Sequence, residues 1–405
     1  MSPSARAPAT TPWNYSSSVL RMRRLVVLVA AIVLVDTMFY AAITPLLPYY
    51  SHHFHLSKSA AGLLAAAYPA GTLLASLPAG WLAARIGVRP TVLTGLALMV
   101  VSSVVFGFAK SASLLDGARF VQGIGGSASW AGGLAWLIAR AEGARRAELI
   151  GTALAAAIAG ALLGPVLGSA ASLTSPKLVF SLVGALGVVL SLYTLTESAP
   201  GPTGGHGLGA FRPALRDSRL LAGMWLTTLG ALLFGTLAVL SPLRLDHLGA
   251  SGVAIGGVFL VGAAAAAVTS PVVGRLSDRH GWQRPVRTGL LASATLAILL
   301  PLPASAALLS VLVVLSDPSF GASYPPAGAM ISAGAERVGL DQGYAFGLFN
   351  LAWGAGQVIG DAGSAGLAQA TSDAVPYALL SAMCLATVLV FNRRSDVPQP
   401  ATRAS

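Results

Sequence analysis

The sequence has few charged residues and almost no cysteine. Charged residues make up 10% of its 405 positions, hydrophobic residues make up 55%, and the mean hydropathy is +0.74. Soluble domains carry about 25% charged residues, so a water-soluble fold is excluded. The lone Cys384 excludes an intramolecular disulfide and a cysteine metal site. The composition predicts an integral membrane protein.

Signals for bound groups are also missing. The Gly-rich run 123–126 lies within an apolar segment rather than after a strand, so it is not a phosphate-binding loop. His52, His53 and His55 stand in one predicted loop without a second ligand cluster, which favours a solvated loop over a metal site. No basic-aromatic module accompanies the pI of about 10.4. We therefore expect no enzyme chemistry, cofactor, metal, nucleic acid or direct ATP drive.

Twelve apolar runs are long enough to cross a bilayer, and they predict an all-α membrane protein with twelve transmembrane helices. The first run is longer than a signal-peptide core and lacks a cleavage pattern after it, so we expect it to be retained. The runs cover residues 25–47, 59–84, 91–109, 114–139, 149–170, 178–196, 220–243, 252–273, 288–304, 305–332, 343–367 and 375–392.

Basic residues predict the orientation. With twelve helices both termini lie on one side, and 20 of the 25 Lys and Arg residues fall on that side. Four fall in the opposite loops, and Arg119 lies inside a predicted helix. Because cytoplasmic loops carry the excess of Lys and Arg, the termini are predicted to be cytoplasmic. Three lysines beside abundant Ala, Gly and Arg indicate a GC-rich bacterial genome, hence a multi-pass protein of the bacterial inner (cell) membrane.

The chain contains two similar halves. Residues 80–87 read GWLAARIG, and residues 274–281 read GRLSDRHG, an offset of 194. The glycines of the fifth predicted helix recur in the eleventh, 196 residues later. These matches predict parallel six-helix repeats with a central site between them. The expected organisation of the monomer is a cytoplasmic tail (1–24), one half (25–196), a cytoplasmic linker (197–219), the other half (220–392) and a second tail (393–405).

One acid interrupts the first apolar run. Asp36 lies about 18 Å beyond Arg24 at 1.5 Å per residue, roughly halfway through a hydrocarbon core of ~30 Å. A carboxylate at that depth is costly unless it faces protein or water, so it predicts a functional group. A purely structural hydrogen-bonding role is the alternative.

Four short motifs stand at helix-related positions. The loop after the second helix of each half carries one motif. In the second half it reads G-x-x-x-D-R-x-G, whereas in the first half Ala84 replaces the acid. The fourth helix carries R-x-x-Q-G-x-G, the fifth carries spaced glycines with a proline, and the first carries D-x8-P-x-x-P. Their residues are Gly80, Arg85 and Gly87; Gly274, Asp278, Arg279 and Gly281; Arg119, Gln122, Gly123 and Gly125; Gly151, Gly160, Gly164, Pro165 and Gly168; and Asp36, Pro45 and Pro48.

Together these motifs resemble those of the major facilitator superfamily, and specifically its twelve-helix drug:proton antiporters, a branch that includes the vesicular monoamine transporters. The resemblance covers the chain from about residue 25 to 393. It implies that the fifth-helix motif marks an exporter, that Asp36 takes part in cation recognition and proton exchange, and that Arg119 takes part in proton coupling. It also implies a cytoplasmic gate held by the loop acid, which is missing at Ala84.

Further polar residues lie within predicted helices. Asp116, three residues before Arg119, is the expected ion-pair partner of its guanidinium. Asp317 is either a second titrating site or part of a turn near the outer surface, because Pro318 follows it. The stripe Asn350, Trp353, Gln357 and Asp361 shares one helix face and is predicted to point inward, with an outer capping or solvent-facing role open for Asp361. The aromatic candidates for a binding cavity are Phe39, Tyr40, Trp130, Tyr324, Phe349 and Trp353.

The sequence thus predicts a transporter driven by the proton gradient that exports small lipophilic or cationic compounds by alternating access. Its expected partners are the substrate, protons and the lipid bilayer. Two alternatives stay open: an importer of a sugar or other metabolite with the same fold, and a membrane sensor or scaffold that does not transport. The fifth-helix motif argues against the importer, and short loops without a signalling domain argue against the sensor.

Overall fold

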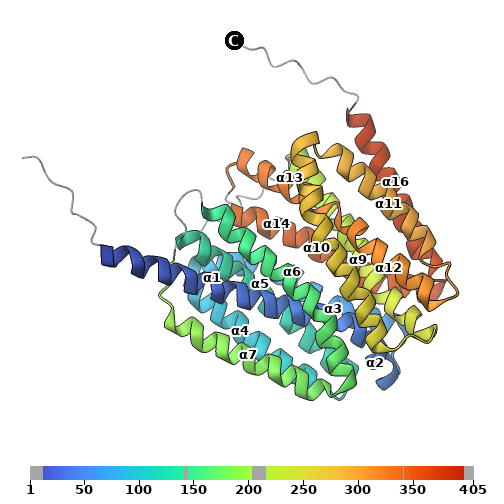
Figure 1. Ribbon diagram of the computed structural model, residues 1–405, viewed down its shortest axis with the longest axis horizontal. Coiled ribbons are helices and arrows are strands. Elements are labelled where there is room, and N and C mark those ends of the chain that lie inside the picture. Colours follow the sequence, from blue (N-terminus) through green and yellow to red (C-terminus); the bar gives the residue numbers. More distant parts are fainter. Residues whose placement is uncertain (1–11, 141–144, 203–215, 341, 396–405) are drawn as a thin grey trace, which may run out of the picture.

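A computed structural model describes residues 12–140, 145–202, 216–340 and 342–395. All regular elements in these residues are helices, and they form twelve segments that run roughly side by side (Figure 1). The predicted all-α class with twelve helices is therefore confirmed. The linker and the two tails were predicted over 197–219, 1–24 and 393–405. These limits stay predictions, since much of each range lies outside the described residues.

The first six segments come from the N-terminal part of the chain. The first is α1 (Pro12–Ala41) continued by α2 (Ile43–His53). The next are α3 (Lys58–Ile86), α4 (Val88–Gly107), α5 (Ala112–Arg140), α6 (Arg145–Leu173) and α7 (Pro176–Thr196).

The last six segments form the other half of Figure 1, coloured yellow to red. They begin with α9 (Ser218–His247), α10 (Gly252–His280) and α11 (Gln283–Leu299). Two of the remaining segments are interrupted. One is α12 (Ala306–Gly321) with α13 (Tyr324–Arg337), and the other is α14 (Gln342–Val358), a π-helical turn η2 (Ile359–Gly363) and α15 (Ser364–Ala370). The last is α16 (Ala374–Ser395).

Nine helices in the described part of the chain are long and apolar enough to cross a membrane by length and composition alone. The other three crossings are α5, α11 and the α14–α15 segment. Helix α11 has 17 residues, the π-helical turn interrupts α14–α15, and α5 carries Asp116, Arg119 and Gln122. These are the crossings whose sequence departs from a continuous apolar run.

The two halves share local geometry at matching positions. Gly87 ends α3 and Gly281 ends α10, and both have positive φ angles, +96° and +82°. Residues with a Cβ rarely adopt this conformation, so glycine is required at each helix end. Ser57 and Ser251 cap the beginning of the same two helices through their hydroxyl oxygens. The 194-residue repeat seen in the sequence therefore has a structural counterpart.

The first segment bends at Ala42, between α1 and α2. Pro45 has no N–H to donate to the carbonyl of Ala41, so the helical ladder is interrupted there. Helix α6 lies against this bend. A Cβ added at Gly160 would lie 3.0 Å from Thr37 Cβ, and one added at Gly164 would lie 3.0 Å from Met38 O. The glycines of the predicted motif thus permit close packing of α6 on α1.

Gly168 continues this contact, since an added Cβ would lie 2.7 Å from Pro45 Cγ. Gly151, the first glycine of the motif, has no neighbour within 4 Å of such an atom and makes no close helix contact. The packing role therefore belongs to three of the four motif glycines.

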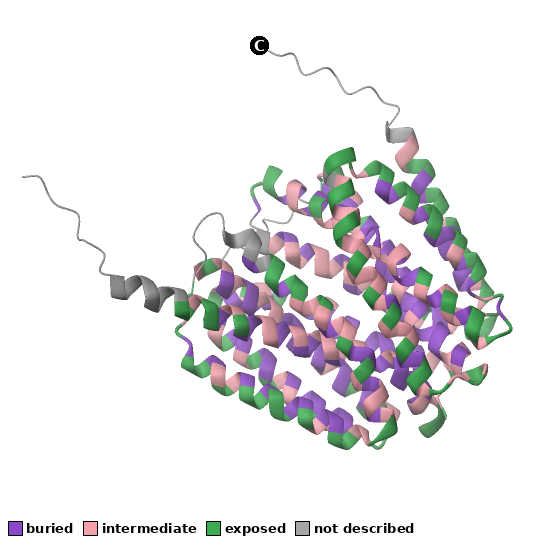
Figure 2. Cartoon of the chain, in the orientation of Figure 1, coloured by how far each residue is buried: buried purple, intermediate pink, exposed green. Residues whose placement is uncertain are grey.

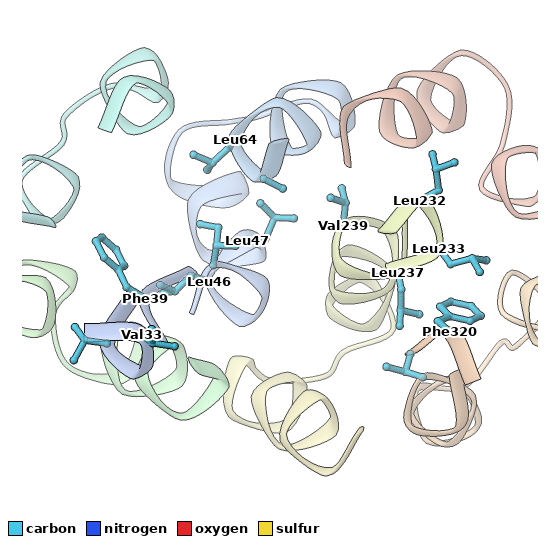
Figure 3. Packing of buried hydrophobic residues seen from close by; sticks show 14 of the residues in the cluster. Val33, Phe39, Leu46, Leu47, Leu64, Leu232, Leu233, Leu237, Val239 and Phe320 are labelled. Carbon is cyan, nitrogen blue, oxygen red and sulfur yellow. The ribbon is translucent and has the colours of Figure 1, made fainter. Parts of the chain in front are cut away.

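Apolar side chains fill the interior of each half. Figure 3 shows Phe39, Leu46 and Leu64 packed among the N-terminal helices and Leu237 and Phe320 among the C-terminal ones. Exposed residues lie mainly on the outward faces of the helices (Figure 2), and many are large and apolar, for example Val268 at 71% and Leu173 at 69% exposure. Such a surface suits lipid rather than water.

Candidate functional site

A cavity of about 250 Å³ lies between the two halves. Helices of both halves line it, mostly with apolar and aromatic side chains. The lining residues are Tyr40, Ala41, Ile43, Thr44, Leu47, Ala65, Ala161, Pro165, Phe234, Leu237, Ala238, Phe259, Ala263, Asp317, Tyr324, Trp353, Gln357 and Asp361. Two are carboxylates, and none of the described residues that line it is Lys or Arg. The cavity is therefore mostly apolar, with two carboxyl groups and no basic side chain among its described lining residues, a composition that suits a lipophilic cation.

Asp361 is one of the two cavity acids. It lies in the π-helical turn η2 and is 2% exposed, so the predicted alternative of a solvent-facing or capping residue is wrong. Gln357 Nε2 donates to Asp361 Oδ1 at 3.3 Å. A Cβ added at Gly235 of α9 would lie 2.8 Å from Asp361 Oδ1, and one added at Gly62 of α3 would lie 2.6 Å from its carbonyl oxygen. Helices from both halves thus hold this residue.

Asp317 is the second cavity acid and comes from α12. The helix continues through Pro318 and is interrupted only after Gly321, so the predicted alternative of a turn at Asp317 is wrong. Gly262 of α10 lies over the carboxylate, because a Cβ there would be 2.8 Å from Asp317 Oδ2. The carboxylate is 9% exposed and faces the cavity.

Asp36 is buried, at 1% exposure, and does not belong to the cavity lining. Tyr68 Oη donates to Asp36 Oδ2 at 2.8 Å, and Trp130 Nε1 donates to the same oxygen at 3.1 Å. The other oxygen, Oδ1, has no hydrogen-bond partner. Gly126 packs against the carboxylate, since a Cβ there would lie 2.8 Å from Oδ1. The predicted midplane acid is therefore enclosed by its own half.

Arg119 is also 1% exposed, and its partners differ from the prediction. Its guanidinium donates to Gln122 Oε1 at 3.0 Å and to the carbonyl oxygens of Phe39 and Tyr40 at 3.4 and 3.3 Å. No hydrogen bond or ion pair joins it to Asp116 in the described part of the chain, and Asp116 Oδ1 has no partner. The expected Asp116–Arg119 bridge is wrong, because the side chain turns toward carbonyls near the α1 bend.

The guanidinium of Arg119 also contacts two aromatic rings. Its central carbon lies 5.2 Å from the ring centroid of Tyr68 and 5.8 Å from that of Tyr40. These distances are within the range of cation–π attraction. Gln122 accepts from Arg119, and its Nε2 is buried without a partner. The fourth-helix motif therefore forms one buried polar cluster beside the first segment.

The predicted stripe and aromatic set are only partly brought together. Trp353, Gln357 and Asp361 line the cavity, but Asn350 does not, although it was predicted to share their inward face. The cavity-lining aromatics among those predicted are Tyr40, Tyr324 and Trp353. Phe39, Trp130 and Phe349 lie outside the lining; Phe39 packs against Phe106 and Phe180, and Phe349 stacks on Phe346.

The loop-motif residues lie at the helix ends near the described termini. Arg85 is exposed and lies over the ring of Trp81, 5.0 Å from its centroid. Arg279 is exposed, and the side chain of Asp278 lies outside the described residues. Cβ atoms added at Gly80 would meet nothing within 4 Å, and one at Gly274 would meet only Pro325. Their predicted gating role stays a prediction.

Polar contacts join the halves at the opposite helix ends. Lys58 Nζ of the N-terminal half lies 2.5 Å from Asp373 Oδ1 of the C-terminal half, while Arg244 Nη1, in the same half as Asp373, lies 3.8 Å from Asp373 Oδ2. His52 Nε2 lies 2.7 Å from Asp246 Oδ2. These contacts lie at the helix ends away from Pro12 and Ser395.

Some residues around these sites were missed by sequence reasoning. Tyr68 was not singled out, because a tyrosine in an apolar run gives no sign of the acid that it contacts from another helix. Trp130 was predicted for the cavity but binds Asp36 instead. Phe234 and Phe259 in the lining look like ordinary apolar helix residues, and only their position reveals them.

Twelve helical segments in two halves around a central cavity define a membrane transporter fold. The chain belongs to the Major Facilitator Superfamily, whose sequence profile it matches over residues 29–360. The twelve-helix major facilitator architecture inferred from the motifs is thereby confirmed.

One curated relative is the multidrug resistance protein MdtL of Escherichia fergusonii, 27% identical over 204 residues. That match spans 49% of this chain and 52% of MdtL, about half the length of each.

Three solved structures share the fold. A bacterial homologue of the human lysosomal transporter Spinster, in an inward-facing and unoccupied conformation, has a TM-score of 0.72 at 16% identity, covering 95% of this chain and 96% of that one. A POT family transporter in complex with 5-aminolevulinic acid has a TM-score of 0.74 at 14% sequence identity, and the match covers 91% of this chain and 96% of that one. A mutant of the nucleoside transporter NupG has a TM-score of 0.72 at 12% sequence identity, and the match covers 91% of this chain and 99% of that one. At these identities the likeness is one of fold.

Proposed function

We propose that this chain is a proton-coupled exporter of small lipophilic cations. The observation that carries the proposal is the cavity between the halves, with two buried carboxylates, aromatic walls and no Lys or Arg among its described lining residues. A cation loses its hydration on entering such a site, and Asp317, Asp361 and the faces of Tyr40 and Trp353 replace it.

Transport proceeds by alternating access of the two halves to the cavity, driven by the proton gradient without a cofactor. The polar contacts Lys58–Asp373 and His52–Asp246 close one end, which positive-inside counting assigns to the outer face. Asp36, Arg119 and Asp317 form the coupling groups. We further propose that the chain is a monomer of the inner membrane with both termini in the cytoplasm, as the excess of basic residues on that side indicates.

Export is favoured over import by two observations. The α6 motif with Gly160, Gly164 and Pro165 is typical of exporters in this superfamily, and MdtL is a multidrug resistance protein. Accumulation of a sugar or nucleoside driven by inward proton flow would support the importer instead. A sensor without transport would show neither activity.

The deciding experiment expresses the chain in a bacterial host that lacks its own multidrug pumps. We expect efflux of a cationic dye and raised resistance to lipophilic cations, both abolished by collapsing the proton gradient. Asp361→Asn removes one cavity charge and should lower cation efflux by about tenfold, a loss of ~1.4 kcal/mol in transition-state stabilisation. Asp116→Asn, the same change outside the cavity, is the matched control and should leave efflux intact. Full resistance with Asp361→Asn at equal expression would contradict the assignment.

A further inference from the structure

Asp36 is buried and lies outside the lining of the cavity between the halves. The cavity lining includes Tyr40 but not Asp36, Tyr68 or Arg119. The Tyr40 and Tyr68 rings lie 4.8 Å apart, and the Tyr68 hydroxyl bonds to Asp36 on the far side. Two aromatic rings therefore stand between the cavity and the carboxylate.

Arg119 holds these two rings in place. Its guanidinium lies near both ring faces and bonds to the carbonyls of Phe39 and Tyr40. On the cavity side, Trp353 packs edge-on against Tyr40 with centroids 5.6 Å apart. The guanidinium already contacts the two rings, the two carbonyls and Gln122. It therefore stabilises the positions of Tyr40 and Tyr68 and does not form an ion pair with Asp36.

Asp36 is closed on its other side as well. Trp130, which donates to Asp36, stacks on Phe346 of α14 with centroids 5.6 Å apart. The titratable groups facing Asp36 are Tyr68 from α3 and Arg119 from α5, while α6 brings Gly160 against the opposite face of α1. The other carboxylate oxygen, Oδ1, has no hydrogen-bond partner and is free to carry a proton.

We propose that Asp36 is a proton site that never touches the substrate, and that Tyr40, Tyr68 and Arg119 form a partition separating it from the substrate carboxylates Asp317 and Asp361. This inference rests on the proposed exporter function and deepens it: coupling between proton and cation is indirect, passing through the partition, rather than competition for one carboxylate. Tyr68 and Trp130 become positioning residues for Asp36.

Thiol labelling tests the partition without any transported substrate. In a Cys384→Ser background, Asp361→Cys and Asp36→Cys variants of the full chain are purified and treated with a small cationic methanethiosulfonate. We expect Asp361→Cys to react at least about tenfold faster than Asp36→Cys, because Asp361 lines the cavity whereas a thiol at position 36, enclosed by Tyr68 and Trp130, must await local opening. Adding Tyr40→Ala should remove most of that difference, whereas Tyr40→Phe should keep it. Equal rates at both positions, or no effect of Tyr40→Ala in a monodisperse protein, would overturn the partition.

A second measurement tests the division of roles with a fluorescent lipophilic cation. Asp36→Asn should bind the dye within about threefold of the parent chain but release no proton on binding, while Asp361→Asn should lose binding by about tenfold. Tyr68→Phe keeps the ring and should retain dye binding while altering proton release. Loss of dye binding in Asp36→Asn, with Asp116→Asn unaffected, would overturn the proposal. If the parent chain binds no cation, the exporter function fails, and the labelling rates still decide the partition.

Discussion

The position and accessibility of individual polar side chains in this protein depend on close contacts with a few neighbouring residues. Gly126 is an example, since it leaves room for the Asp36 carboxylate and the Tyr68 hydroxyl. Asp361 depends in the same way on Gly235, and Arg119 on the carbonyls at the bend of the first segment. In a bilayer, where small residues let polar groups approach each other without water, such single contacts decide which acids are accessible.

Gly126→Ala tests the close packing of Gly126 against Asp36 and Tyr68. The added methyl group would lie 2.7 Å from Tyr68 Oη and 2.8 and 2.9 Å from the two Asp36 oxygens, so the pair must shift. We expect loss of proton-coupled efflux and destabilisation by about 1–3 kcal/mol, as for overpacking of a core. Gly117→Ala on the same helix meets nothing within 4 Å and should change neither. Thermal unfolding in detergent and dye efflux in cells measure both; unchanged values for Gly126→Ala would contradict the tight packing.

At the scale of elements, the interruptions of regular helix coincide with the site. The first segment bends at Ala42, next to Tyr40 and Thr44 of the cavity, and the α14–α15 segment contains the π-helical turn with Asp361. A π-helical turn inserts an extra residue into the helix and is frequent at functional sites. In the repeat, Asp361 occupies the position of Pro165, but α6 continues through Pro165 as a regular helix, so the interruption at this level belongs to the C-terminal half.

Gly235→Ala tests the role of the π-helical turn. The new Cβ would lie 2.8 Å from the Asp361 backbone nitrogen and from Oδ1, and 2.9 Å from the Gln357 carbonyl. Since backbone atoms cannot rotate away, α9 must separate from the turn, and cation binding should fall by about tenfold. Gly257→Ala in α10 meets nothing within 4 Å and serves as control. Dye binding to purified protein is the measurement, and normal affinity in Gly235→Ala would show that the turn tolerates displacement.

On the scale of the whole molecule, the two halves meet at one end through charges and along α3 and α14 through small residues. Gly354 of α14 packs on α3, where a Cβ would lie 3.2 Å from Leu73 Cβ. The charged contacts lie at the ends of these helices, around Asp373. Ion pairs can dissociate and re-form at low cost, whereas close helix packing resists separation, so the charged end is where the two halves can separate, and the proposed orientation makes it the outer end.

Asp373→Asn tests this opening. The change removes the ion-pair partner of Lys58 across the halves and that of Arg244 within one half. The contact between the halves at this end should therefore weaken by an amount on the order of 1 kcal/mol. In intact cells, a membrane-impermeant thiol reagent added outside should then label an Asp317→Cys, Cys384→Ser chain several-fold faster. Asp217→Asn, which removes the partner of Arg337 within one half, is the control and should not change the rate. Labelling unaffected by Asp373→Asn would place the opening elsewhere.

The sequence predicted the crossings well because apolar runs and glycine or proline breaks are local signals. The repeat pairs ending at Gly87 and Gly281 were found the same way. The site was predicted less well. Asp317, Asp361, Tyr40 and Trp353 do line the cavity, but Asp116 does not pair with Arg119, and Asn350 stands outside the lining. A pattern along one helix gives the face of a residue, not the neighbour that faces it from another helix.

By itself, the sequence determined that this chain is a twelve-helix membrane protein of the Major Facilitator Superfamily, because burial of apolar runs in lipid and the spacing of small residues act locally. Only the tertiary structure decided which acids share the cavity between the halves. Asp36 is the one acid of the first helical segment, Pro12–His53, yet Tyr68 and Trp130 from other helices enclose its carboxylate. Access to a buried carboxylate depends on contacts between segments far apart in the chain, and no local pattern encodes them.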